Sequence, residues 1–127
     1  MIYHVILKPD EPYRVEFALT ARGDAPARDF LDSLPERPRK KAAAWIALLA
    51  EKGPDLPRPY ADAVSGPIRE LRVSFGRLEI RVLYFIHGRR VVLTSGFLKK
   101  TRAVPPGEIA RAERLRALWL SSRERPS

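Results

Sequence analysis

Charged side chains that could do chemistry lie within one apolar stretch of the chain, Ile68–Arg102. Glu70 and Arg81 stand between aliphatic and aromatic residues, and a lysine pair, Lys99–Lys100, comes near the end of the stretch. An arginine among apolar strand residues loses much of its hydration, so it needs an anionic partner. That partner can be a bound phosphate, which arginine contacts with two parallel N–H groups. It can equally be a carboxylate of the chain, in an Arg81–Glu70 or Arg81–Glu79 ion pair.

Three predicted strands position these charges: Ile68–Phe75, Leu78–Ile86 and Arg90–Phe97. Each is rich in β-branched and aromatic residues, and short turns that contain glycine separate them, which predicts an antiparallel meander. Side chains alternate between the two faces of a strand, so Glu70 lies on one face of its strand and Leu71 on the other. The charges therefore belong to the sheet itself and not to its loops.

The rest of the chain predicts one further strand and three helices. Periodicity and turn residues place them at Tyr13–Leu19, Ala25–Ser33, Pro38–Lys52 and Pro106–Ser122. Ile2–Leu7 is a candidate for a short additional strand, and the proline-rich Gly53–Ala63 is predicted to be a loop. The order β-α-α-β-β-β-α predicts an α+β fold. We expect a small antiparallel sheet with the helices packed on one face and the other face open.

Length and composition indicate an ordinary globular chain. We expect residues 1–127 to form a single domain, with 1–12 as an N-terminal extension and 123–127 as a frayed tail. The chain has no cysteine, and no apolar run approaches the length of a membrane span. Met1–Lys8 has neither a basic start nor a long apolar core, so we expect no signal peptide. Together these features predict a cytoplasmic protein without disulfides.

Positive charge is concentrated in one half of the chain. The net charge is +9, yet residues 1–67 carry ten Lys/Arg and ten Asp/Glu. Residues 68–127 carry fourteen Lys/Arg against five Asp/Glu, so this half holds the whole excess. Genome composition can enrich arginine, but it does not explain the asymmetry. A basic half of this kind predicts a polyanionic partner, with nucleic acid as the usual candidate and an acidic protein segment as the alternative.

Several short motifs in this half carry a family resemblance. They are Glu70-Leu71-Arg72, Arg81-x-x-Tyr84, Gly96-Phe97-Leu98-Lys99-Lys100-Thr101 and Pro105–Ala110. In this order, after a strand and two helices, they resemble the RelE/ParE toxin superfamily, and within it the HigB-like branch of phage-derived toxins. The resemblance covers about residues 13–120.

The resemblance implies a RelE-like fold and the toxin of a type II toxin–antitoxin system. Such a toxin is a metal-independent endoribonuclease that cuts mRNA on the ribosome. Its expected partners are the ribosome, the message and a helix-turn-helix antitoxin, with no membrane and no small-molecule cofactor. The cut is made by the 2′-hydroxyl of the RNA, which attacks the adjacent phosphate. This step needs a proton acceptor and cations that stabilise the pentavalent intermediate.

By the same resemblance, Arg81 matches the strand arginine that stabilises the phosphate, and Lys99 and Lys100 join it. The sequence has no histidine or tyrosine near the end of the last strand, so Glu70 or a lysine with a lowered pKa is the expected base. Further RNA contacts are expected from basic residues and from one aromatic ring that could stack on a base: Arg69, Arg72, Arg77, Arg102 and Phe97.

Two other functions stay open. A ParE-like toxin would bind and poison DNA gyrase without cutting RNA, and a degenerate relative would only bind RNA. The combination of a strand-centred Arg81 with Lys99 and Lys100 favours the nuclease over these two functions. The sequence shows no metal-ligand cluster and no glycine-rich phosphate loop, so we expect no metal and no cofactor.

Overall fold

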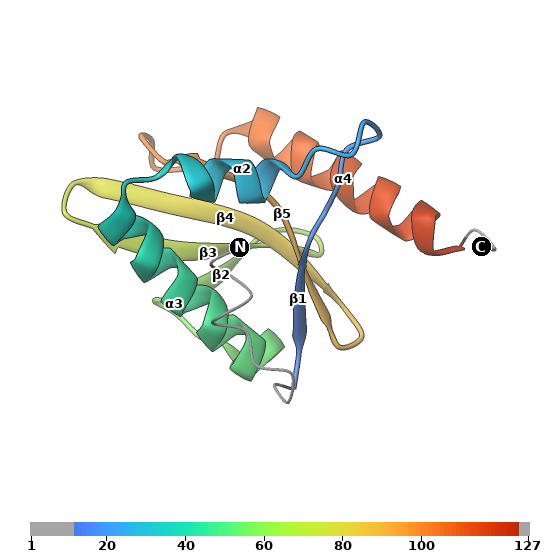
Figure 1. Cartoon of the computed structure of the whole chain (residues 1–127), viewed down its shortest axis with the longest axis horizontal. Coiled ribbons are helices and arrows are strands. Elements are labelled where there is room, and N and C mark those ends of the chain that lie inside the picture. The colour runs from blue at the N-terminus through green and yellow to red at the C-terminus, as the bar shows by residue number, and fades with distance from the viewer. Residues whose placement is uncertain (1–11, 125–127) are drawn as a thin grey trace.

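The computed structural model describes residues 12–124, and the candidate strand Ile2–Leu7 lies outside this range. Figure 1 shows the elements in chain order. They are β1 (Arg14–Phe17), α2 (Pro26–Ser33), α3 (Glu36–Lys52), the short 3₁₀ helix η1 (Gly53–Asp55), β2 (Ala61–Ser65), β3 (Ile68–Phe75), β4 (Leu78–His87), β5 (Arg90–Leu98) and α4 (Pro106–Glu124). The predicted α+β class is confirmed. Helix α4 ends at Glu124, two residues after the predicted end at Ser122.

The five strands form one sheet in the order β1-β5-β4-β3-β2. Strands β3, β4 and β5 form the expected antiparallel meander, and β2 pairs antiparallel with β3. Strand β2 was predicted as part of a loop, because Ala61–Ser65 has little β propensity of its own and gains its pairing from β3. The expectation of a purely antiparallel sheet was also wrong, since β1 runs parallel to β5.

The helices pack on both faces of the sheet, which corrects the expectation that they share one. Residues of α2 and α3 form one buried cluster with Leu71, Val82 and Leu93. Residues of α4 form a second cluster with Leu83 and Phe85, which point to the opposite face by strand alternation. Strand β4 is apolar on both faces at its centre, and both faces need cover.

Within the described residues, no helix is both long enough and apolar enough to cross a membrane.

One close approach between α2 and the sheet depends on a glycine. Gly96 lies in β5 opposite Val82, on the face that α2 covers. The ring of Phe30 in α2 occupies the position that a β-carbon of residue 96 would need. The absence of a side chain at Gly96 therefore allows α2 to lie directly on β5.

We predict that Gly96→Ala lowers the free energy of unfolding by about 1–3 kcal/mol, because the added methyl group displaces the Phe30 ring. Gly107→Ala is the matched control, since nothing lies within 4 Å of a β-carbon there. That control should be neutral or stabilising by roughly 0.4–1 kcal/mol. Urea denaturation of both variants provides the comparison. Equal effects would show that the contact with Phe30 carries no energetic weight.

Candidate nucleic-acid interface

Arg81 lies at the centre of three paired strands. In the sheet register it is opposite Arg72 of β3 on one side and opposite Phe97 of β5 on the other. Its side chain is only 4% exposed. A guanidinium buried to this degree must be compensated by nearby anions or acceptors.

Two carboxylates and a carbonyl oxygen compensate Arg81. Its Nε lies 3.0 Å from Oε1 of Glu70, whose side chain is also buried. Its Nη1 donates to the carbonyl oxygen of Ile80 at 3.0 Å and to Oε1 of Glu79 at 3.3 Å. Its Nη2 donates to the same Glu79 oxygen at 3.4 Å. The structure therefore contains both ion pairs that the sequence offered as alternatives to a bound phosphate.

The contact between Arg81 and Glu70 is electrostatic and not a well-directed hydrogen bond. The two atoms are 3.0 Å apart, but their geometry does not satisfy the directional requirement of a hydrogen bond. Among the described residues, neither Arg81 Nε nor Glu70 Oε1 has a hydrogen-bond partner. Attraction between opposite charges in a poorly hydrated site offsets this loss. Each charge therefore needs the other to stay buried.

Glu79 differs from Glu70 because it reaches the surface. Its side chain is 42% exposed, and its Oε1 also accepts a hydrogen bond of 2.8 Å from the hydroxyl of Ser74. The sequence predicted Glu79 only as an alternative ion-pair partner of Arg81, and it did not predict the contact between Glu79 and Ser74. The ion pair could be predicted because Glu79 and Arg81 are two residues apart and therefore lie on the same face of the strand.

A group of cations surrounds this end of the meander. The backbone N–H of Lys99 donates to the carbonyl oxygen of Glu79 at 2.7 Å, which fixes the start of the lysine pair beside β4. Lys99 is half-buried, whereas Lys100 and Arg102 in the following loop are exposed, as is Arg77 in the β3–β4 turn. None of the four forms an ion pair with a described carboxylate. We call these four residues the basic cluster.

One expected RNA contact, Arg69, lies on the other face of the sheet, and another, Phe97, is half-buried. Arg69 is on the opposite face of β3, where its Nε donates to the hydroxyl of Tyr84 at 3.3 Å. Burial raises the pKa of Tyr84, and the hydrogen bond from Arg69 partly opposes this effect. Phe97 is half-buried and packs against the cluster beneath α4, so its stacking on a base stays a prediction. The structure thus brings Arg72 and Glu70 to Arg81, but not Arg69.

Metal chemistry would need a group of ligands. In the part of the chain that the structure describes, no three His, Cys, Asp or Glu side chains are grouped closely enough to hold a metal ion.

Comparison with known proteins identifies the family. The model of the phage-derived protein Gp49-like family (DUF891) matches residues 29–117. The chain belongs to this family. The matched region begins within α2 and ends within α4, so it includes β2–β5 and the basic cluster. No curated protein matches the sequence.

The Gp49-like family is a family of toxin–antitoxin toxins of the RelE/HigB type. The resemblance read from the motifs is therefore confirmed at the level of this family. Membership also implies an antitoxin partner.

The buried pair yields a test of stability. Arg81→Ala leaves the carboxylate of Glu70 buried without its cation, so we expect the free energy of unfolding to fall by about 3–5 kcal/mol. The double variant Arg81→Met/Glu70→Gln removes both charges and should recover much of this loss. Urea denaturation at neutral pH measures both. A single variant as stable as the parent would show that the pair is not a structural element.

Proposed function

We propose that this chain is a toxin that cleaves mRNA on the ribosome, with the basic cluster as the surface that binds the message backbone. One observation carries the proposal. Arg77, Lys99, Lys100 and Arg102 gather at one end of the meander and have no described carboxylate partner. Cations that have no described carboxylate partner are available for phosphates, and most contacts of nucleic-acid-binding proteins go to the backbone.

The reaction would use the RNA itself as the nucleophile. The 2′-hydroxyl gives its proton to a base and attacks the adjacent phosphorus. The bond to the 5′-oxygen of the next nucleotide breaks, that oxygen takes up a proton, and the products are a 2′,3′-cyclic phosphate and a 5′-hydroxyl. Negative charge grows on the phosphate oxygens as the bond forms, so cations fixed nearby lower the barrier. Lys99 suits this role because its backbone is held by Glu79, and Lys100 extends the charge toward solvent.

Arg81 would act from behind the basic cluster. Among residues 12–124, its Nη2 is held only by the 3.4 Å contact to Glu79, and Glu79 is partly exposed. A phosphate that displaces Glu79 would therefore accept a hydrogen bond from Nη2 of Arg81. The Nη1 atom would remain bound to the carbonyl oxygen of Ile80, and Nε would remain beside Glu70. Glu70 is a positioning residue in this scheme, because its buried carboxylate orients Arg81 and has little access to solvent. Arg72, opposite Arg81 in the register, adds positive charge to the same row.

The partners follow from this scheme. The ribosome presents the message, and the toxin acts in the cytoplasm. The antitoxin that the family implies would be a helix-turn-helix protein, as in the type II systems that the motifs resemble.

Inducible expression in a bacterial host, with mapping of new RNA 5′ ends, tests the proposal. New ends within open reading frames, spaced in phase with codons, are the expected result. DNA-damage signalling with intact messages would instead indicate a gyrase poison. Toxicity with neither outcome would also reject cleavage of mRNA.

The basic cluster yields a prediction about rate. The double variant Lys99→Ala/Lys100→Ala should cleave ribosome-bound mRNA about 100-fold more slowly, but each single variant only roughly 3-fold more slowly, because the remaining lysine partly substitutes for the lost one. Lys52→Ala is the control, since Lys52 is exposed at the last turn of α3 on the other side of the sheet. Single-turnover cleavage rates with purified ribosomes are measured for the parent and for all four variants. If the double variant and the control cut equally fast, the basic cluster is not the site.

A further inference from the structure

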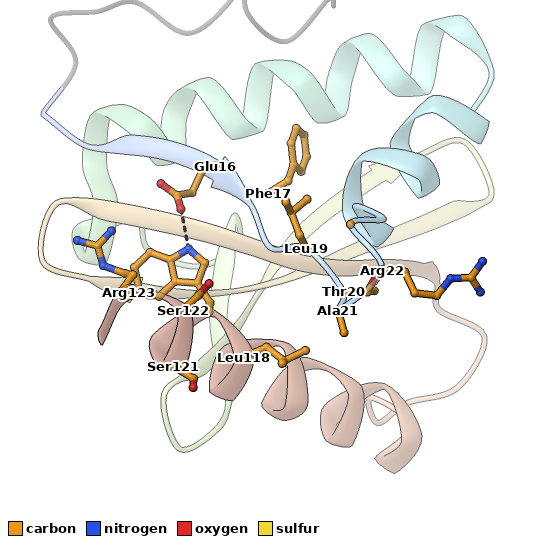
Figure 2. A pocket seen from close by; sticks show the side chains of 12 residues that line it. Glu16, Phe17, Leu19, Thr20, Ala21, Arg22, Leu118, Ser121, Ser122 and Arg123 are labelled. Carbon is orange, nitrogen blue, oxygen red and sulfur yellow. Dashed lines mark hydrogen bonds between the residues drawn. The ribbon is translucent and has the colours of Figure 1, made fainter. Parts of the chain in front are cut away.

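A pocket lies between the loop after β1 and the second half of α4, away from the basic cluster. Its volume is about 720 Å³. Figure 2 shows its lining, with Leu118 of α4 directed toward the loop that contains Leu19. Pro106 and Leu118 are twelve residues apart on α4, which corresponds to roughly 18 Å at 1.5 Å per residue. The pocket and the lysine pair, which precedes α4, are therefore at different ends of this helix.

The floor of the pocket is held rigidly. The indole Nε1 of Trp119 donates to Oε1 of Glu16 at 2.6 Å, and Nη1 of Arg90 donates to Oε2 of the same carboxylate at 2.6 Å. The Trp119 ring also meets Phe85 edge to face, with 5.4 Å between the centroids. Both oxygens of Glu16 are thus occupied, and its charge is balanced by Arg90. A surface that is already ordered loses little conformational entropy when a partner binds.

Exposed apolar side chains gather at this pocket. Leu19 is 52% exposed and Leu118 is 43% exposed. In the described part of the chain only one other large apolar side chain is exposed, Leu98 at 40%, and it lies at the end of β5. Two exposed leucines on opposite walls of one pocket can bind an apolar side chain of a partner between them.

The rim of the pocket is positive. Arg22 and Arg123 line it from its two ends, as Figure 2 shows. Arg123 lies over the Trp119 ring, 4.7 Å from its centroid, so its guanidinium is held at the rim. Neither arginine forms an ion pair with a described carboxylate. A pocket with two exposed leucines inside it and two cations at its rim selects a ligand that is apolar at its centre and anionic at its edges.

We propose that this pocket binds a segment of the antitoxin that presents a leucine- or phenylalanine-sized side chain flanked by carboxylates. Charge complementarity favours an anionic partner over a second copy of the chain, because two chains that each have a net charge of +9 repel each other. The inference rests on membership of a toxin–antitoxin family and goes beyond the nuclease mechanism. An antitoxin anchored here contacts the end of α4 that is distant from the lysine pair.

Isothermal titration calorimetry tests the proposal. The full-length toxin is placed in the calorimeter, and the purified protein encoded beside the toxin gene is titrated into it. Leu118→Glu and Leu19→Glu should each weaken binding roughly 10- to 100-fold, because a carboxylate replaces an apolar contact. Arg22→Glu/Arg123→Glu should weaken it and reduce its dependence on salt. Leu98→Glu, which changes the exposed leucine outside the pocket, is the matched control and should bind like the parent.

Folding and oligomeric state are checked on the same samples. Circular dichroism identifies any variant that is not folded, and Leu118→Ala, which introduces no charge, then replaces Leu118→Glu. Unchanged affinity in folded variants of both leucines overturns the proposal. A dimer of the parent that Leu118→Glu converts to a monomer, with unchanged antitoxin affinity, reassigns the pocket to self-association. These readouts do not involve RNA, so a parent protein that fails to cut mRNA leaves the test intact.

Discussion

The buried pair of Arg81 and Glu70 constrains the pairing of β3 with β4, at the centre of the sheet. A slip of one residue between β3 and β4 would move one member of the pair to the other face and leave two buried charges without partners. The present register of β3 with β4, in which Arg72 is opposite Arg81, is therefore strongly favoured over its neighbours. The separate register of β4 with β5 brings Lys99 beside Glu79. The placement of the basic cluster thus depends on both strand pairings of β4.

The two faces of the sheet serve different purposes. Helices α2 and α3 bury one face, and Gly96 allows α2 to approach closely. Helix α4 covers part of the other face through Leu115 and Trp119, and it also forms one wall of the pocket beside the loop after β1. The chain therefore separates a cationic surface at one end of α4 from a pocket with two exposed leucines at the other. This separation is compatible with the proposed binding of RNA and of an antitoxin at different sites.

Much of the fold followed from local sequence. The strand Ile68–Phe75 has the predicted bounds, because β-branched residues and the Gly76 turn define both of its ends. Strand β2 was missed because its pairing comes from β3 and not from its own residues. The cover that α4 gives to the second face was missed although the apolar centre of β4 indicated it.

The site was predictable only in part. Strand alternation brought Glu70 and Arg81 to one face, but it could not show that Arg81 would be 4% exposed and shared between two carboxylates. Strand alternation also puts Arg69 on the face opposite to Glu70, but it could not show that Arg69 would donate to the hydroxyl of Tyr84. The exposure of a side chain and the identity of its hydrogen-bond partner depend on which strands are adjacent in the sheet. The alternation pattern of a single strand does not determine the order of the strands.

The central claim is that the cations of this toxin promote attack by the hydroxyl of the message itself. The most direct measurement compares two ribosome-bound messages that differ only by a 2′-deoxy nucleotide at the cut position. The account predicts that the ordinary message yields a 2′,3′-cyclic phosphate and a 5′-hydroxyl, and that the deoxy message binds equally well but is not cut. Cleavage of both messages at the same rate would contradict it, because the nucleophile would then not be the 2′-hydroxyl.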